Sequence, residues 1–285
     1  MANRAIYFLV FSLPGLLFLF IYIIYPLALD VASSFTNWGP VANWFTPAFK
    51  FLGLQNYAYL FTDPLFLESF YTNLIWLAVN VPASMFLGML FALLLTNEHT
   101  KGARAFRTLV FAAMAIPPTV AAFMFGYMLF ASNTGFINAV FFGNKLNVFG
   151  LYWPGLLMMI LITIWSSTPL ATIVYMAGIS IIPRSVLEAA WIDGAPLLTR
   201  FTKIYLPLLR PAHVVSFVML SILTLKVFDV VYTLRAPGGA SVMLYYMYQN
   251  YSYGAWGYAN SVIVVISAIV VAIAIPLTLL MFRRR

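Results

Sequence analysis

Six apolar runs, each about 20 residues or longer, limit the possible folds of this chain more than any other feature. They cover residues 6–29, 72–96, 105–131, 153–179, 208–234 and 260–282. Because about 20 apolar residues in a helix cross the hydrocarbon core of a bilayer, each run is long enough to be a transmembrane helix. The sequence therefore predicts an all-α, polytopic membrane protein, with six transmembrane helices in a single domain over residues 1–285.

The composition fits a lipid-facing surface. Hydrophobic residues make up 64% of the chain and charged residues 8%, whereas a soluble domain needs a far more charged surface. The net charge of +8 does not indicate nucleic-acid binding, because the basic residues lie between the apolar runs, where their retention in the cytoplasm explains them. The chain has no cysteine and only two isolated histidines, His99 and His213, so we expect neither disulfides nor a metal site.

The distribution of Lys and Arg predicts the orientation in the membrane, because cytoplasmic loops carry an excess of basic residues. One side would hold three of them, Lys50, Lys145 and Arg235. The other would hold eleven, which are Arg4, Lys101, Arg104, Arg107, Arg184, Arg200, Lys203, Arg210, Arg283, Arg284 and Arg285. We therefore predict that both termini are cytoplasmic, and that the first run stays in the mature chain as an anchor because it is too long for a cleaved signal peptide.

The segment over residues 180–207 carries the most specific pattern, and we predict that it is cytoplasmic. Glu188, Ala189 and Ala190 are followed by three residues, Gly194, nine residues, Ile204, one residue, and then Leu206 and Pro207. The first three favour a helix with a small face, Gly194 permits a turn, and Pro207 begins the next span. From these properties alone, the segment is either an interfacial helix anchored by Arg200 and Lys203 or a helix that protrudes to meet a partner.

At these residues the sequence resembles the permease subunits of binding-protein-dependent ABC importers, whose cytoplasmic motif has this spacing. Shorter matches to the carbohydrate and glycerol-phosphate branch, the MalF- and UgpA-like subunits, follow in order along the chain. They are Leu13-Pro14, Tyr25-Pro26-Leu27, Ser34-Phe35-Thr36, Trp38, Phe51, Gly53-Leu54, Asn56-Tyr57, Asp63-Pro64, Arg104, Phe106-Arg107, Ala177-Gly178, Ile182-Pro183 and Val227-Phe228-Asp229. The loop at 235–239 departs from this branch, whose members usually carry a Thr followed by a glycine run and proline.

The resemblance implies a type I ABC importer (MetI-like) permease fold in a prokaryotic inner membrane. It implies import of a sugar, an oligosaccharide or a glycerol phosphate by alternating access. Residues from about 184 to 205 would form a coupling helix that docks on a cytoplasmic ATPase subunit. The coupling residues would be Glu188, Ala189, Ala190, Asp193, Gly194, Arg200 and Pro207.

The implied partners are a second, different permease subunit, two ATP-binding subunits, an external or periplasmic solute-binding protein, and the lipid bilayer. The chain itself has no Gly-x-x-x-x-Gly-Lys-Ser/Thr phosphate loop, so ATP hydrolysis must occur on another polypeptide. We therefore expect a transporter subunit rather than an enzyme. No cofactor is expected in this chain, and ATP and Mg would bind to the partner ATPase subunits.

Polar residues on the fourth and fifth spans are candidates for the substrate path. They are Ser167, Thr168, Thr172 and Tyr175 on the fourth span and Thr224, Phe228, Asp229 and Tyr232 on the fifth. Two interpretations of the hydroxyls stay open, because in lipid such groups bond to their own helix or join neighbouring helices, or else they line a pore that binds sugar hydroxyls. The family places its transport path among these helices.

Two further features have open interpretations. Lys226 and Asp229 lie three residues apart on the fifth span, so we expect them to share a helix face, where they could form an ion pair that is structural, gates transport or contacts the cargo. An aromatic run would form a belt at the membrane interface or stack on sugar rings. Its members are Tyr245, Tyr246, Tyr248, Tyr251, Tyr253, Trp256 and Tyr258, within an expected external segment at 235–259.

Other functions remain as alternatives. A permease of the same family for a different small solute would show the same patterns. An ion-coupled secondary transporter would need buried carboxylates, and the spans hold only Asp229 and, at an outer end, Asp30. A membrane-embedded enzyme would need a nucleophile and a base, but the sequence has no Gly-x-Ser-x-Gly, paired histidine or paired intramembrane aspartate.

Overall fold

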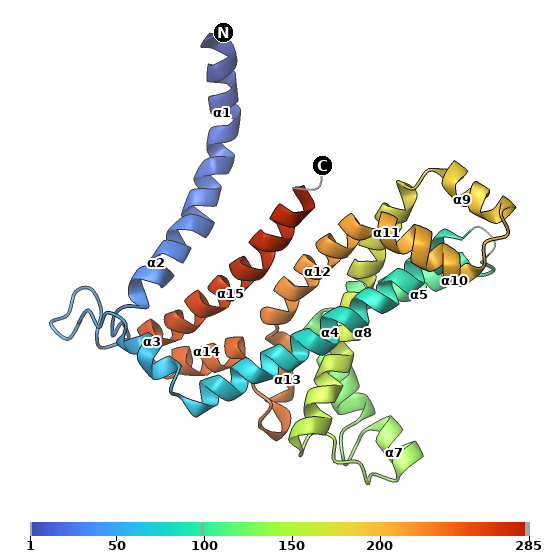
Figure 1. Cartoon of the computed structure of the whole chain (residues 1–285). Coiled ribbons are helices and arrows are strands. Elements are labelled where there is room, and N and C mark those ends of the chain that lie inside the picture. The colour runs from blue at the N-terminus through green and yellow to red at the C-terminus, as the bar shows by residue number, and fades with distance from the viewer. Residues whose placement is uncertain (1, 98–99, 283–285) are drawn as a thin grey trace. The chain divides into compact units, whose positions relative to one another are not determined.

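The computed structural model describes residues 2–97 and 100–282 and is built from helices (Figure 1). The expectation of an all-α protein is confirmed, since the extended structure in these residues is an isolated bridge between Thr36 and Phe51. His99 and the basic tail of Arg283, Arg284 and Arg285 lie outside the described residues.

The helices in the described part of the chain differ widely in length. The α-helices are α1 (Ala2–Leu19), α2 (Tyr25–Ser33), α3 (Gln55–Leu60), α4 (Pro64–Thr96), α5 (Ala103–Ala115), α6 (Pro118–Phe123), α7 (Phe136–Phe142), α8 (Tyr152–Ser180), α9 (Arg184–Ile192), α10 (Leu197–Arg200), α11 (Leu206–Leu208), α12 (Arg210–Leu225), α13 (Asp229–Leu234), α14 (Met243–Ser252) and α15 (Trp256–Phe282). The π-helical segments are η1 (Phe20–Ile24), η2 (Met124–Leu129) and η3 (Phe201–Tyr205), and η4 (Pro237–Gly239) is a 3-10 turn.

Five helical stretches among the described residues are long and apolar enough to cross a membrane, and a bent pair of helices brings the total to six. The five are Val10–Ser33, Pro64–Thr96, Tyr152–Ser180, Arg210–Leu234 and Trp256–Leu279. The pair covers the third predicted run, which was expected to form one helix over 105–131. There Ala103–Ala115 and Pro118–Leu129 meet at 99°.

Two consecutive prolines explain this bend. Pro117 and Pro118 have no backbone N–H to continue a helix, and a residue before proline is pushed out of the helical conformation. Ile116 accordingly has an extended backbone, with φ −89° and ψ 121°. The third run is therefore two helices instead of the single helix expected over 105–131.

The described contacts divide the chain into two compact units. Unit 1 contains Met1–Leu67 and Tyr246–Ala268, and unit 2 contains Glu68–Tyr245 and Ile269–Arg285. In unit 2, α8 is the central helix and packs against α5, α6, α12 and α13. Two apolar clusters surround it: one includes Trp76 and Leu156, and the other includes Val81 and Tyr175.

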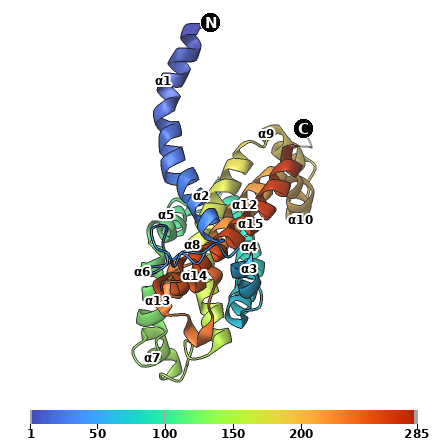
Figure 2. The ribbon, with the colours of Figure 1, turned by 90° about the vertical axis from the view of Figure 1, so that its left-hand side faces the viewer.

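Side chains from both ends of the chain hold unit 1 together. The amide of Asn56 donates to the carbonyls of Ser34 and Thr36, at 2.8 and 2.9 Å. The amide of Asn260, which lies on α15, donates to the Ser33 hydroxyl at 2.6 Å. Figure 2 shows α14 alongside the first turns of α15. By contrast, the side chains from Val10 to Val31 are mostly exposed, as expected for an anchor that faces lipid or another helix.

Asp63 lies at the centre of a second polar cluster in unit 1. The Tyr246 hydroxyl donates to the Asp63 carboxylate at 2.5 Å, and the Tyr258 hydroxyl lies 3.4 Å from the same oxygen. The two hydroxyls are 2.9 Å apart. Burial, followed by the hydrogen bond to Asp63, raises the pKa of Tyr246 far above its usual value, so this phenol stays protonated. Two tyrosines of the aromatic run therefore serve a structural contact.

We predict that Gly88→Ala destabilises unit 2, because α4 and α8 approach closely at this glycine. A Cβ added at Gly88 would fall 2.5 Å from the Cβ of Ala171 and 2.9 Å from the backbone nitrogen of Thr172, which cannot move aside. Overpacking of this kind costs about 1 to 3 kcal/mol. Thermal unfolding of the purified full chain in detergent measures the effect.

Gly15→Ala is the matched control, since a Cβ added at Gly15 would meet no atom within 4 Å. Because alanine favours a helix over glycine by about 1 kcal/mol, this variant should be as stable as the unaltered chain or slightly more so. Equal unfolding temperatures for Gly88→Ala and the unaltered chain would contradict the close approach of α4 and α8.

Candidate functional site

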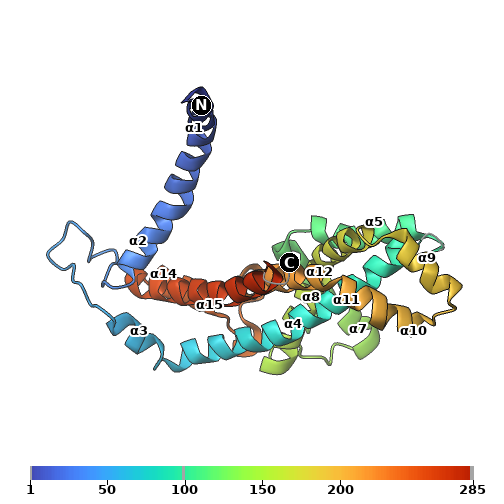
Figure 3. The same cartoon turned by 45° about the horizontal axis from the view of Figure 1, so that its top comes forward.

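The segment over residues 180–207 folds as a helix, a turn and a second helical stretch at one end of unit 2. Figures 1 and 3 show α9 and α10 together there, joined by a short turn, and Figure 1 places them far from α7. Pro183 precedes α9 with φ −59° and ψ 131°, a conformation that starts the helix without a donor to satisfy. After the turn, α10, η3 and α11 lead to α12 without a long loop.

Gly194 ends α9 in a complete Schellman motif. Its φ is +65°, in the left-handed region that glycine adopts without strain. The Ala195 N–H donates to the Ala190 carbonyl at 3.0 Å, and the Gly194 N–H donates to the Trp191 carbonyl at 3.1 Å. These two bonds satisfy helix-end carbonyls that would otherwise lack partners. The motif therefore fixes the direction in which the chain leaves α9.

Arg200 and Trp191 join the two halves of this segment. The guanidinium carbon of Arg200 lies 3.8 Å from the centre of the Trp191 ring, a cation–π contact between α10 and α9. Arg200 was predicted as a coupling residue, but its partner was missed, because Trp191 occupies one of the unspecified positions of the motif. A tryptophan nine residues before an arginine, across a glycine turn, was the available signal.

The other predicted coupling residues lie around this turn. Ala190 is the buried residue of α9, whereas Glu188, Ala189 and Asp193 are exposed. Pro207 lies in α11, just before α12 begins. Large apolar side chains are also exposed next to the turn, with Trp191 63% and Ile192 85% accessible. An ordered helix that presents such side chains together with carboxylates has the character of a docking surface.

The predicted polar residues of α8 are buried inside unit 2. The Thr168 hydroxyl donates to the Ile164 carbonyl at 2.7 Å, and the Thr172 hydroxyl donates to the Thr168 carbonyl at 2.9 Å. Tyr175 is hydrogen-bonded through its hydroxyl to Nδ1 of His213, at 2.8 Å. Two of these hydroxyls therefore bond to their own helix, and the third joins α8 to α12.

Ser167 and Thr224 belong to a buried network that links α4, α8 and α12. The Asn80 amide donates to the Thr224 hydroxyl at 2.8 Å, and Asn80 Oδ1 lies 3.4 Å from the Ser167 hydroxyl. The Ser84 and Ser167 hydroxyls are 2.9 Å apart. Asn80 and Ser84 were missed in the sequence, although they lie four residues apart on one face of an apolar helix. That spacing was the signal that could have identified them.

The expectation that Lys226 and Asp229 share a helix face is wrong. α12 stops at Leu225, and α13 begins at Asp229 after Phe228, whose φ of −140° and ψ of −53° are not helical. The geometric basis for the expected ion pair is therefore absent. Asp229 instead lies in the first turn of α13, where the helix dipole favours a carboxylate.

The remaining predicted path residues lie next to this break. The rings of Phe228 and Tyr232 stack, with centroids 5.2 Å apart and an interplanar angle of 23°. Tyr232 and Asp229 are exposed, unlike the buried hydroxyls of α8. The eight predicted residues therefore form two sets, one buried among helices and one at the break, where Asp229 and Tyr232 are exposed and Phe228 is half-buried. No group of three or more histidine, aspartate or glutamate side chains within 2–97 and 100–282 is placed to hold a metal ion.

Comparison with known proteins relates this arrangement to a family. A family model described as binding-protein-dependent transport system inner membrane component matches residues 84–283, which include the whole segment from α8 to α12. The trehalose/maltose transport system permease protein MalF of Thermococcus litoralis is 30% identical over 81% of this chain and 80% of its own length. The sulfoquinovosyl glycerol transport system permease protein SmoG of Agrobacterium fabrum is 31% identical over 90% of this chain and 84% of its own length.

The fold is also found in a solved structure. A chain of a bacterial ABC transporter involved in the import of the acidic polysaccharide alginate superposes with a TM-score of 0.83 and 21% identity, covering 99% of this chain and 96% of the other. The shared fold agrees with the family match. The chain belongs to the family of inner membrane components of binding-protein-dependent transport systems.

Proposed function

We propose that this chain is one of two permease subunits in an ATP-driven importer, and that its partner is a second, different permease. Two ATPase subunits would bind ATP and Mg and drive the change between inward-open and outward-open states, and an external binding protein would deliver the cargo. The observation that carries the proposal is the ordered segment at 184–205. Its fixed exit at Gly194 and its exposed Trp191 and Ile192 suit a helix that transmits motion from a docked partner.

The cargo is proposed to be a sugar, an oligosaccharide or a glycerol phosphate. The names of the relatives support this class, since one carries trehalose and maltose and another a sulfoquinovosyl glycerol. Among the predicted path residues, Asp229 and Tyr232 are exposed, so these are proposed to contact the cargo. The buried hydroxyls of α8 would reach it only if the helices separate during transport.

Both termini are proposed to be cytoplasmic, together with the segment at 180–207, and the segment at 235–259 to be external. Because the chain has no cysteine, Ser185→Cys and Ser252→Cys test this without background, and both serines are exposed. In intact cells an impermeant thiol reagent should label the cysteine at 252, and the one at 185 only after the membrane is opened. The reverse pattern would reject the orientation.

Loss of the contact between Arg200 and Trp191 is predicted to weaken ATPase binding. Such a contact is worth about 0.5 to 1 kcal/mol at an exposed site, so Trp191→Ala or Arg200→Gln should reduce the copurified ATPase about two- to fivefold. Arg200→Lys should retain part of the binding, because an ammonium group can still lie over the ring. Copurification and cargo-stimulated ATP hydrolysis are the measurements.

Lys203→Gln is the control, since it removes the same charge from the neighbouring segment η3 without removing the ring contact. Binding and hydrolysis should stay near the values of the unaltered subunit. If Trp191→Ala behaves like this control, the contact does not position the helix for its partner.

The two sets of path residues should respond differently to substitution. Tyr232→Ala is predicted to lower uptake while leaving thermal stability unchanged, because Tyr232 is exposed beside the helix break. Ser167→Ala should instead lower stability by about 0.5 to 1.5 kcal/mol, the worth of a hydrogen bond, without changing cargo preference. Tyr71→Ala, another exposed tyrosine, should do neither. Altered cargo preference in Ser167→Ala with normal uptake in Tyr232→Ala would contradict this assignment.

A further inference from the structure

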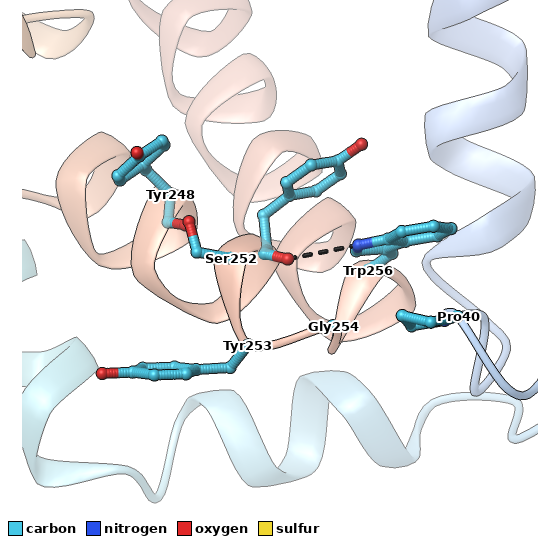
Figure 4. A pocket seen from close by; sticks show the side chains of 7 residues that line it. Pro40, Tyr248, Ser252, Tyr253, Gly254 and Trp256 are labelled. Carbon is cyan, nitrogen blue, oxygen red and sulfur yellow. Dashed lines mark hydrogen bonds between the residues drawn. The ribbon is translucent and has the colours of Figure 1, made fainter.

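An open cavity of about 560 Å³ lies in unit 1, where α14 meets α15 (Figure 4). Its size is within the range of small-molecule sites, roughly 300 to 1,000 Å³. The lining residues are Pro40, Tyr248, Tyr251, Ser252, Tyr253, Gly254 and Trp256. The lining therefore contains four aromatic rings and no charged side chain, which suits a neutral ligand with apolar faces.

The turn at Gly254 holds these rings in place. Gly254 has a φ of +86°, and its N–H donates to the Tyr251 carbonyl at 3.0 Å, while the Ala255 N–H donates to the Asn250 carbonyl at 3.0 Å. The Trp256 indole N–H donates to the same Tyr251 carbonyl at 3.2 Å, as Figure 4 shows. α14 thus ends in a second Schellman motif, which fixes the wall before any ligand arrives.

The loop that contains Pro40 is fastened to the same junction. The Gly257 N–H donates to the Trp38 carbonyl at 2.8 Å. The rings of Trp38 and Trp256 meet edge to face, with centroids 5.5 Å apart, and Tyr251 stacks on Trp256 at 5.6 Å. An interfacial aromatic belt needs only exposed rings. Here the rings line one open cavity, and hydrogen bonds and ring contacts hold its wall in place.

The members of the aromatic run have different surroundings, and Tyr245 packs against Phe228 and Tyr232. Tyr246 and Tyr258 direct their hydroxyls to Asp63. Tyr253, by contrast, is 86% exposed at the edge of the cavity, where its ring and hydroxyl are available to a ligand. A sugar ring combines an apolar C–H face with hydroxyls at its edge, and this wall offers an aromatic face beside phenol and serine hydroxyls.

We propose that this cavity binds one ring of a neutral sugar on the external side of the importer. The proposal rests on the proposed function, because it assigns a site for that cargo class outside the spans. The sugar stacks on the exposed aromatic wall beside the Tyr253 hydroxyl. The Ser252 hydroxyl donates to the Tyr248 carbonyl at 2.8 Å, so its oxygen is left to accept from a sugar hydroxyl. Since the lining has no basic side chain, an anionic sugar gains no ion pair there.

The test measures binding of maltose, trehalose and glucuronic acid to the full chain in lipid nanodiscs by saturation-transfer NMR titration. Saturable binding of a neutral sugar is expected, with weaker binding of glucuronic acid. Tyr253→Ala should weaken sugar binding about tenfold, which corresponds to about 1.4 kcal/mol. Tyr253→Phe should retain most of the binding because it keeps the ring. Tyr22→Ala is the matched control, since Tyr22 is 69% exposed on η1, away from the cavity lining.

Three results would overturn the proposal: no saturable binding of either neutral sugar, equal binding by Tyr253→Ala and the unaltered chain, or equal losses in Tyr253→Ala and Tyr22→Ala. Uptake by the complete importer separates this failure from failure of the proposed function. If the importer takes up sugar but no sugar binds in the cavity, the proposed cavity site is rejected and the proposed function is retained. Binding through Tyr253 without uptake of any sugar or glycerol phosphate rejects the proposed function.

Discussion

A polar group inside the hydrocarbon region needs a partner from the protein itself, and the arrangement of unit 2 depends on this constraint. Asn80 lies on α4 where it reaches both the Thr224 hydroxyl of α12 and the Ser167 hydroxyl of α8. One amide therefore ties three helices that otherwise contact one another through apolar side chains. In lipid, apolar contacts do not distinguish protein from solvent as they do in water, so this network contributes specificity to helix packing.

The same constraint explains why the interrupted span is tolerated. The helix stops at Leu225 and restarts at Asp229, which leaves backbone groups without regular partners. The Val227 N–H still donates to the Thr224 carbonyl at 3.2 Å. Asn73 on α4 adds a contact on each side of the break, since its amide reaches the same Thr224 carbonyl at 3.5 Å and its oxygen accepts a bond from the Met243 N–H at 2.8 Å. α4 thus joins the end of α12 to the start of α14.

The features that could be predicted from the sequence are those that one residue type determines by its own properties. The apolar runs gave the membrane helices, and Gly194 gave the end of α9, because glycine alone adopts its left-handed conformation without strain. Contacts between residues on different helices could not be predicted in this way, because each depends on a partner far away in the sequence. The spacing of Trp191 and Arg200 across Gly194 permits their contact but does not require it, and neither Asn80 nor Asp63 indicates which helix will supply its hydrogen bonds. The break before Asp229 was also missed, because Lys226, Val227 and Phe228 contain neither glycine nor proline.

Unit 1 is built from two segments at opposite ends of the chain, which affects how the protein folds during synthesis. Asp63 is synthesised early, but its partners Tyr246 and Tyr258 follow 183 and 195 residues later. During synthesis the Asp63 carboxylate therefore lacks its hydrogen bonds to Tyr246 and Tyr258 until almost the whole chain has left the ribosome. The N-terminal segment cannot reach its final structure before then. Unit 2 draws on a mostly continuous stretch and can begin packing sooner. Maturation of unit 1 is thus coupled to completion of the polypeptide, and a chain truncated before α14 would never assemble it.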